Sequence, residues 1–134
     1  MTFTYNLELQ RWEAHVEFQG ETISLALDES FPETELDIIA ANLLARISGA
    51  WPQIEGNIAD SLHSTYNESW ADPEQGAPKM NRAEFLARTK FESLEVDDNK
   101  SLTLYFSESG LFSGHWIEIF WNANGRMYPA NLMA

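Results

Sequence analysis

Apolar and polar residues alternate along the N-terminal part of the chain. The alternation runs over residues 3–9, over residues 12–18 and, after Gly20, over residues 23–27. A period of two is typical of strands that bury one face and leave the other in water. We therefore predict three half-buried antiparallel strands in this part of the chain.

The apolar spacing changes to three and four after residue 34. Over residues 36–47 this spacing predicts a helix with one apolar face, and Gly49 is expected to end it. Thr34 followed by Asp37 predicts a capping box at the start of this helix. A second helix, with a proline in its first turn, is predicted over residues 51–70.

A break follows the second predicted helix. Two prolines and a glycine within residues 71–79 predict an exposed loop. Too little chain remains for a second core, so the loop is not interpreted as a domain boundary. Asn81, followed three residues later by Glu84, predicts the cap of a third, short helix.

Alternation returns in the C-terminal third. It predicts three strands, at residues 91–96, 102–106 and 115–121. Residues 126–133 are expected to form an edge strand, because Pro129 lacks the N–H that a ladder hydrogen bond needs. The order of elements predicts a single α+β domain over residues 1–134. Its antiparallel sheet would combine the N-terminal three strands with the C-terminal three to four, and two to three helices would pack on one face.

Composition narrows the classes of function. The chain has 134 residues, of which 44% are hydrophobic and 22% charged, as in ordinary globular proteins. The absence of cysteine excludes disulfides, thiolate nucleophiles and zinc–cysteine sites. No run approaches the roughly 18 apolar residues that span a bilayer, and the first ten residues do not resemble a signal peptide. We therefore expect a cytoplasmic protein with no membrane partner.

The formal net charge of −13 is unevenly distributed. Residues 12–78 hold thirteen acidic side chains and a single basic one, Arg46. Such a field repels nucleic acid and attracts a basic protein, although carboxylates also simply keep a surface solvated. We expect a basic protein partner and no nucleic acid. The residues expected to contact this partner are Glu13, Glu17, Asp28, Glu29, Glu33, Glu35 and Asp37, with the exposed rings of Trp51 and Trp70 as anchors.

His115 is the strongest candidate for chemistry. It lies between Gly114 and Trp116, where Glu108 or Ser113 could assist it as a general acid or base. No nucleophile motif such as G-x-S-x-G accompanies it, so we favour a structural histidine, with Trp116, Phe120 or their neighbours filling the core. No catalytic residue is therefore predicted. The alternative is a small ligand-binding or hydrolytic domain, whose pocket would include Tyr66, Tyr105, Phe112 and His115.

Two further patterns concern metals. Glu13, His15 and Glu17 share one face of a predicted strand, about 7 Å apart at the usual strand rise. One strand spreads such ligands too far for a common ion, so we interpret them as a solvated face. The stretch DDNK at residues 97–100 lacks the spacing of a calcium loop and predicts a turn. We expect no metal and no cofactor.

The second half of the chain resembles a family of small bacterial proteins known as domain of unknown function 2262. The resemblance rests on YNESW (66–70), on residues 80–96 and on LTLYFSESGLFSGHWIEIFWNANG (102–125). The positions that fit the pattern of the family are Tyr66, Asn67, Trp70, Glu84, Phe85, Leu94, Val96, Leu104, Tyr105, Leu111, Phe112, Gly114, His115 and Ile117. SESG replaces the usual acidic turn before the glycine, and NANG replaces an aspartate, whereas the LF-x-GH core is retained.

This resemblance implies a cytoplasmic accessory domain with no established activity. By analogy with other small acidic families, it favours an immunity protein that acts against a toxin. Our leading hypothesis is therefore a non-catalytic acidic binding protein, an immunity-type inhibitor of a basic bacterial toxin or effector. A structural or oligomerising domain, with the strand of Pro129 at a sheet edge, is the third hypothesis.

Overall fold

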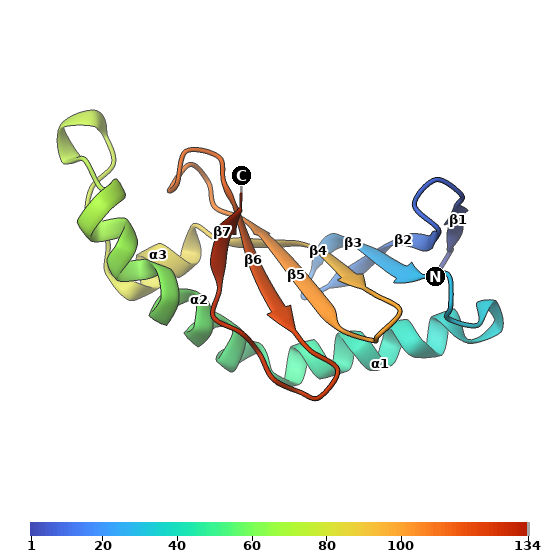
Figure 1. Cartoon of the computed structure of the whole chain (residues 1–134). Helices are drawn as coiled ribbons and strands as arrows, with labels where there is room; N and C mark the ends of the chain where they lie inside the picture. Colours follow the sequence, from blue (N-terminus) through green and yellow to red (C-terminus); the bar gives the residue numbers. More distant parts are fainter. Residues whose placement is uncertain (134) are drawn as a thin grey trace.

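The computed structural model is built on one seven-stranded sheet with strand order β1-β2-β3-β4-β5-β6-β7 (Figure 1). All neighbouring strands are antiparallel except β3 and β4, which are parallel. The structure describes residues 1–133, and Ala134, which the domain prediction includes, lies outside them. The predicted α+β class, with strands on both sides of the helices in sequence, is confirmed.

The N-terminal part forms three strands, as predicted, but the first is short. The strands are β1 (Thr4–Asn6), β2 (Arg11–Phe18) and β3 (Glu21–Asp28). The strand predicted from the alternation over residues 3–9 is therefore wrong beyond Asn6. Leu7 and Leu9 are 78% and 56% exposed. Asn6 turns the chain here, because its Oδ1 accepts a hydrogen bond from the Leu9 N–H at 3.0 Å.

The first helical segment begins differently from the prediction. A short 3₁₀ turn, η1 (Glu33–Glu35), leads into α1 (Leu36–Gly49). No side chain caps α1, so the capping box expected from Thr34 and Asp37 does not form. The 3₁₀ turn supplies backbone hydrogen bonds instead, among them Glu35 N–H to Pro32 O at 3.0 Å.

The second helix ends in an unusual turn. It comprises α2 (Trp51–Thr65), with a proline in its first turn as predicted, and a π-helical turn, η2 (Tyr66–Trp70).

The 71–79 segment contains a short 3₁₀ turn, η3 (Pro73–Gln75), and Asp72 and Ala77 form a small bridge across it.

The C-terminal part contains the predicted short helix and four strands. The elements are α3 (Arg82–Ala87), β4 (Lys90–Val96), β5 (Leu102–Ser107), β6 (Trp116–Trp121) and β7 (Asn131–Met133). The edge strand predicted over residues 126–133 is shorter than expected, since β7 begins only after Pro129.

The predicted cap of α3 is confirmed. Asn81 Oδ1 accepts from the Glu84 N–H at 2.8 Å, and Glu84 Oε1 accepts from the Asn81 N–H at 3.0 Å. This reciprocal pair satisfies two N–H groups that the first turn of a helix leaves free.

Replacing Asn81 by alanine should lower the free energy of unfolding by about 1 kcal/mol, because the N-terminal cap is lost. Chemical denaturation measures the change. Asn42, exposed in the middle of α1, is the matched control: alanine favours a helix interior, so Asn42→Ala should cost nothing. Equal losses at both positions would contradict the cap.

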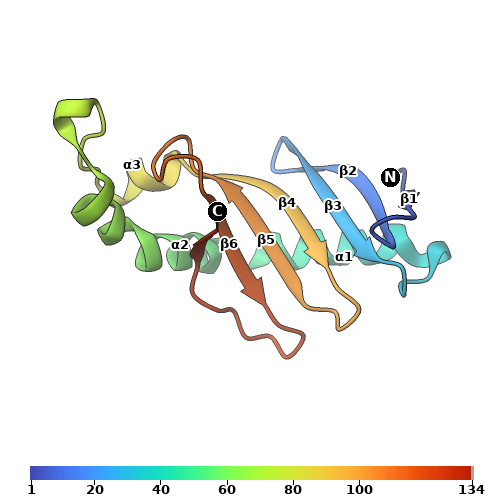
Figure 2. The same ribbon diagram turned by 45° about the horizontal axis from the view of Figure 1, so that its top comes forward.

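The helices α1 and α2 cover one face of the sheet (Figures 1 and 2). They lie in the connection between β3 and β4, which are parallel and therefore need a crossover of at least about a dozen residues. The core lies between the two layers. A row of buried side chains crosses the sheet on this face, comprising Ala14, Leu25, Leu94, Leu104 and Ile119. Within residues 1–133, no helix combines the length and the apolar character that a bilayer crossing requires.

Candidate functional site

The other face of the sheet is not covered by the helices (Figure 2). The strand registers arrange its side chains in two rows that cross the sheet. The first row contains Glu13, Ala26, Glu95, Thr103 and Phe120. The second row contains His15, Ser24, Ser93, Tyr105, Glu118 and Asn131. We call the side of the sheet that carries these two rows the open face.

The open face is hollowed where β3 and β4 run side by side. The short side chains of Ser24, Ala26 and Ser93 form the floor of this hollow, which has a volume of about 500 Å³. Longer side chains of β2 line one side, and Glu95 lines the other. Alternation in the sequence predicts the polar residues of this face. It does not predict the hollow, which forms because small residues on two adjacent strands lie side by side.

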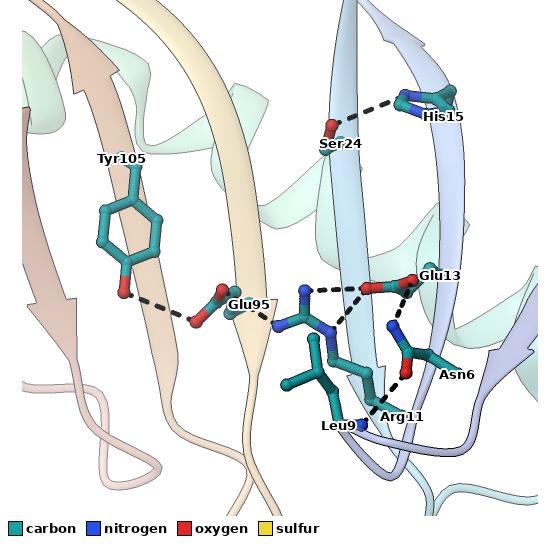
Figure 3. Close-up of polar contacts among 8 residues, drawn as sticks. All are labelled: Asn6, Leu9, Arg11, Glu13, His15, Ser24, Glu95 and Tyr105. Atoms are coloured by element: carbon teal, nitrogen blue, oxygen red, sulfur yellow. Dashed lines mark hydrogen bonds and ion pairs between the residues drawn. The ribbon is translucent and has the colours of Figure 1, made fainter.

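Arg11 joins two carboxylates across this hollow (Figure 3). Its Nη2 lies 2.7 Å from Glu13 Oε2, and its Nη1 donates to Glu95 Oε1 at 3.1 Å. Ala26 lies between the two carboxylates in the strand register, and its methyl group leaves room for the guanidinium. Hydrogen bonds from Asn6 and from Arg11 lower the pKa of Glu13. This carboxylate is therefore held ionised in a fixed position.

Tyr105 extends the network toward β6. Its hydroxyl donates to Glu95 Oε2 at 3.4 Å, and Glu118 is its cross-strand neighbour. Burial, followed by the negative charges of Glu95 and Glu118, raises the pKa of Tyr105 to about 12. The phenol resists ionisation because a phenolate would meet two carboxylates there.

A pH titration can test this electrostatic environment. The phenolate signal of Tyr105 is identified as the one that is missing in Tyr105→Phe, and in the wild-type protein it should titrate near pH 12. Glu118→Gln should lower the pKa of Tyr105, because it removes a negative charge. The folded pKa is raised, so the stability that Tyr105 contributes is present below pH 10 and lost as the pH rises toward 12. Glu84→Gln, on α3, should leave the titration unchanged. Ionisation of Tyr105 near its ordinary pKa of 10 would contradict this environment.

The acidic residues expected to bind a partner fall into two groups. Glu13 and Glu17 project from β2 on the open face. The remainder lie between the last residue of β3 and the first turn of α1, and they are Asp28, Glu29, Glu33, Glu35 and Asp37. In this second group, Glu29 accepts a hydrogen bond from the Tyr5 hydroxyl at 2.6 Å. The two groups meet where Asp28 pairs in register with Arg11.

The two tryptophans expected as exposed anchors are partly buried instead. Trp51 packs on Phe18, Phe91 and Phe106, with ring centroids 5.4–6.1 Å apart. Trp70 packs edge-on against Phe112 and His115, at 5.5 and 5.8 Å. Their packing partners come from distant parts of the sequence, which local pattern cannot reveal. Much of the surface of each ring is therefore buried in packing contacts that stabilise the fold.

The loop from Glu108 to His115 is held by its own polar groups. The buried Glu108 carboxylate accepts hydrogen bonds from the backbone N–H groups of Gly110 and Phe112. His115 Nδ1 lies 2.5 Å from the Phe112 carbonyl oxygen. A carbonyl can only accept, so Nδ1–H is the donor. This contact closes the loop and places the Phe112 ring in the core.

The Y-N-x-x-W motif fixes the segment that follows η2. Asn67 pairs with the backbone of Met80 in both directions: its Nδ2 donates to Met80 O and its Oδ1 accepts from Met80 N–H, each at 2.9 Å. The Tyr66 hydroxyl donates to Pro78 O at 2.9 Å, and His63 Nε2 donates to Met80 O at 2.6 Å. The 71–79 loop is therefore attached to α2 and η2 at its C-terminal end.

The residues expected to line a pocket around His115 separate into two places. Tyr66, Phe112 and His115 come together with Trp70 in a packed aromatic cluster, where Tyr66 and Phe112 are fully buried. Tyr105 lies on the open face beside Glu95. Within residues 1–133, no cluster of three histidine or acidic side chains is placed to hold a metal ion.

Several residues of the open face were not identified by the prediction from the sequence. Trp116 and Phe120 were expected in the core, yet they are 43% and 37% exposed. Glu118 lies between them on the same side of β6, and Glu95 lies on β4, two strands away and in the same row as Phe120. The signal was present, because strict alternation in WIEIFW assigns Ile117, Ile119 and Trp121 to the buried side.

These features define a class: an α+β protein whose single sheet carries helices on one face and a polar, carboxylate-rich open face on the other. The sequence profile of a family described as an uncharacterized protein conserved in bacteria (DUF2262) matches residues 1–132. The chain belongs to this family, and the match extends well beyond the second half on which the resemblance was based. Comparisons with curated proteins and with solved structures gave no match.

Proposed function

We propose that this protein is a non-catalytic acidic binding protein, an immunity-type inhibitor of a basic bacterial toxin or effector in the cytoplasm. The observation that carries the proposal is the surplus of carboxylates on the open face. Glu13, Glu17, Glu95 and Glu118 project from it, and Arg11 is shared between Glu13 and Glu95. Negative surfaces of this kind speed association with a positively charged partner and disfavour wrong ones.

Exposed aromatic rings on the same face support a protein partner. Trp116 and Phe120 project from β6, and their exposed area is available for burial in an interface. Aromatic residues in desolvated positions contribute much of the binding energy at protein interfaces, whereas peripheral charges mainly set the association rate. These rings replace Trp51 and Trp70 as the proposed anchors.

The alternative, a ligand-binding or hydrolytic pocket around His115, receives no support from the geometry. One imidazole nitrogen is committed to the Phe112 carbonyl, and packed rings occupy the adjacent space. Tyr105, the remaining member of that pocket, faces Glu95 on the open face. We therefore do not propose it.

Affinity capture from the source bacterium tests the proposal. The wild-type protein should retain a basic protein at low ionic strength and less of it at moderate ionic strength. A variant with Glu13→Gln, Glu17→Gln and Glu118→Gln should lose it, whereas Glu74→Gln, in the 71–79 loop, should not. The retained protein, expressed alone, should arrest growth, and co-expression should relieve the arrest. Recovery of no basic protein under either condition would contradict the proposal.

A further inference from the structure

Glu118 lies between two exposed aromatic rings. On β6 the side chains of Trp116, Glu118 and Phe120 project to the open face, while Ile117 and Ile119 are buried. Residues two apart on one side of a strand are about 7 Å from each other. The carboxylate is therefore within reach of a group that rests on either ring.

A cavity opens next to Trp116. It has a volume of about 310 Å³ and is lined by Ser93 and Glu95 of β4, Tyr105 of β5, Trp116 of β6 and Met133 of β7. Tyr105 pairs directly with Glu118 across the two strands. The lining of the cavity thus combines two aromatic rings, a serine and one carboxylate, Glu95, and Glu118 lies next to Tyr105 in the strand register.

Negative charge at this cavity is only partly compensated. Arg11 contacts one oxygen of Glu95, and the other accepts a hydrogen bond from Tyr105. Among residues 1–133, no lysine or arginine forms an ion pair with Glu118. Burial first, and then the charges of Glu95 and Glu118, raise the pKa of Tyr105, whose side chain lines the cavity.

The chain itself places arginines over aromatic rings elsewhere. Arg46 of α1 lies 4.2 Å from the ring centre of Trp121, and Arg126 lies 4.6 Å from that of Tyr128. Both contacts have the geometry of a cation–π interaction. Within the part of the chain that the structure describes, the ring of Trp116 has no such cation.

We propose that this cavity receives an arginine side chain of the basic partner, with the guanidinium over Trp116 and its N–H groups donating to Glu118 and Glu95. The inference rests on the proposed function and names the site on the open face that anchors the partner. Arginine fits better than lysine, because a planar guanidinium stacks on a ring while its several N–H groups reach carboxylates at the same time.

The test uses the peptide acetyl-Arg-Arg-Arg-amide and its lysine counterpart as probes. With ¹⁵N-labelled protein, the indole N–H signal of Trp116 should shift on addition of the arginine peptide, and less on addition of the lysine peptide. Trp116→Ala and Glu118→Gln should each weaken binding by about 3- to 30-fold, as expected for loss of a cation–π contact or a charged hydrogen bond. Glu74→Gln and Ile38→Ala, exposed on η3 and α1, serve as matched controls and should leave binding unchanged.

The outcomes separate this inference from the proposed function. Binding that survives Trp116→Ala and Glu118→Gln but weakens in Glu33→Gln and Glu35→Gln overturns the cavity and leaves a basic partner in place. No binding of either peptide anywhere on the protein contradicts both. Concentration-dependent dimerisation that Trp116→Ala abolishes would also overturn the inference, because a second copy would then cover the cavity.

Discussion

Replacing Phe112 by alanine is expected to lower the free energy of unfolding by about 3–5 kcal/mol, the cost of emptying a fully buried aromatic site. Its ring lies in a cluster with Tyr66, Trp70 and Phe85, at centroid distances of 5.9, 5.5 and 6.1 Å. The loop hydrogen bonds of Glu108 and His115 hold the backbone of Phe112 in place. Surrounding rings on short, fixed segments cannot collapse fully into the space, so the cost is large.

Urea denaturation, followed by circular dichroism, measures this loss. Phe120 provides a matched control of the same residue type, because its ring is 37% exposed on β6 and packs only partly, against Tyr128. Phe120→Ala should cost about 1 kcal/mol or less. Similar losses at the two positions would show that the Phe112 loop is not part of the core, and the structural interpretation of the LF-x-GH motif would fail.

Replacing Asn67 by alanine is expected to cost about 2–3 kcal/mol. Two hydrogen bonds to the backbone of Met80 are lost, and the Met80 N–H is left without its acceptor, Asn67 Oδ1. The segment between η3 and α3 should then open more often, so the Met80 amide hydrogen should exchange faster with solvent.

Asn67→Asp should recover part of this stability at neutral pH, because the carboxylate still accepts from the Met80 N–H. Ser69→Ala, exposed in the same turn, should change little and controls for altering η2. Amide exchange and urea denaturation give the two readouts. Unchanged protection of Met80 in Asn67→Ala would contradict the role assigned to the Y-N-x-x-W motif.

Most elements with local causes were predicted well. The exceptions are the turn that the Asn6 side chain forms at Leu9 and the start of α1, where the capping box of Thr34 and Asp37 does not form. Asn81 and Glu84 form their capping box because both partners lie within four residues of each other. Gly49 ends α1, and a proline opens α2, as expected. Strands β2, β4, β5 and β6 follow from alternation that the sheet preserves.

Features that depend on distant residues were predicted poorly. Trp51 was expected to be exposed, yet its ring packs against side chains of three separate strands. Strand order decides which residues become neighbours, and a single sequence does not reveal that order.

The candidate site depends on strand order in the same way. Arg11 and Glu95 are 84 residues apart and meet because β3 and β4 pair in parallel. Charge counting along the sequence located the acidic excess in residues 12–78, whereas Glu95 and Glu118 lie outside that stretch and complete the open face. His115 was the first candidate because it follows Gly114, but the positive φ of Gly114 serves the turn of the loop.

The central claim is that negative charge is concentrated on the open face and the adjoining connection from β3 to α1. Broadening of amide NMR signals by a cationic nitroxide, relative to a neutral nitroxide of similar size, measures this directly. We expect the largest excess broadening at β2, β4, β6 and η1, and we expect added salt to reduce it. Excess broadening spread evenly over the surface, or centred on residues 108–115, would contradict it.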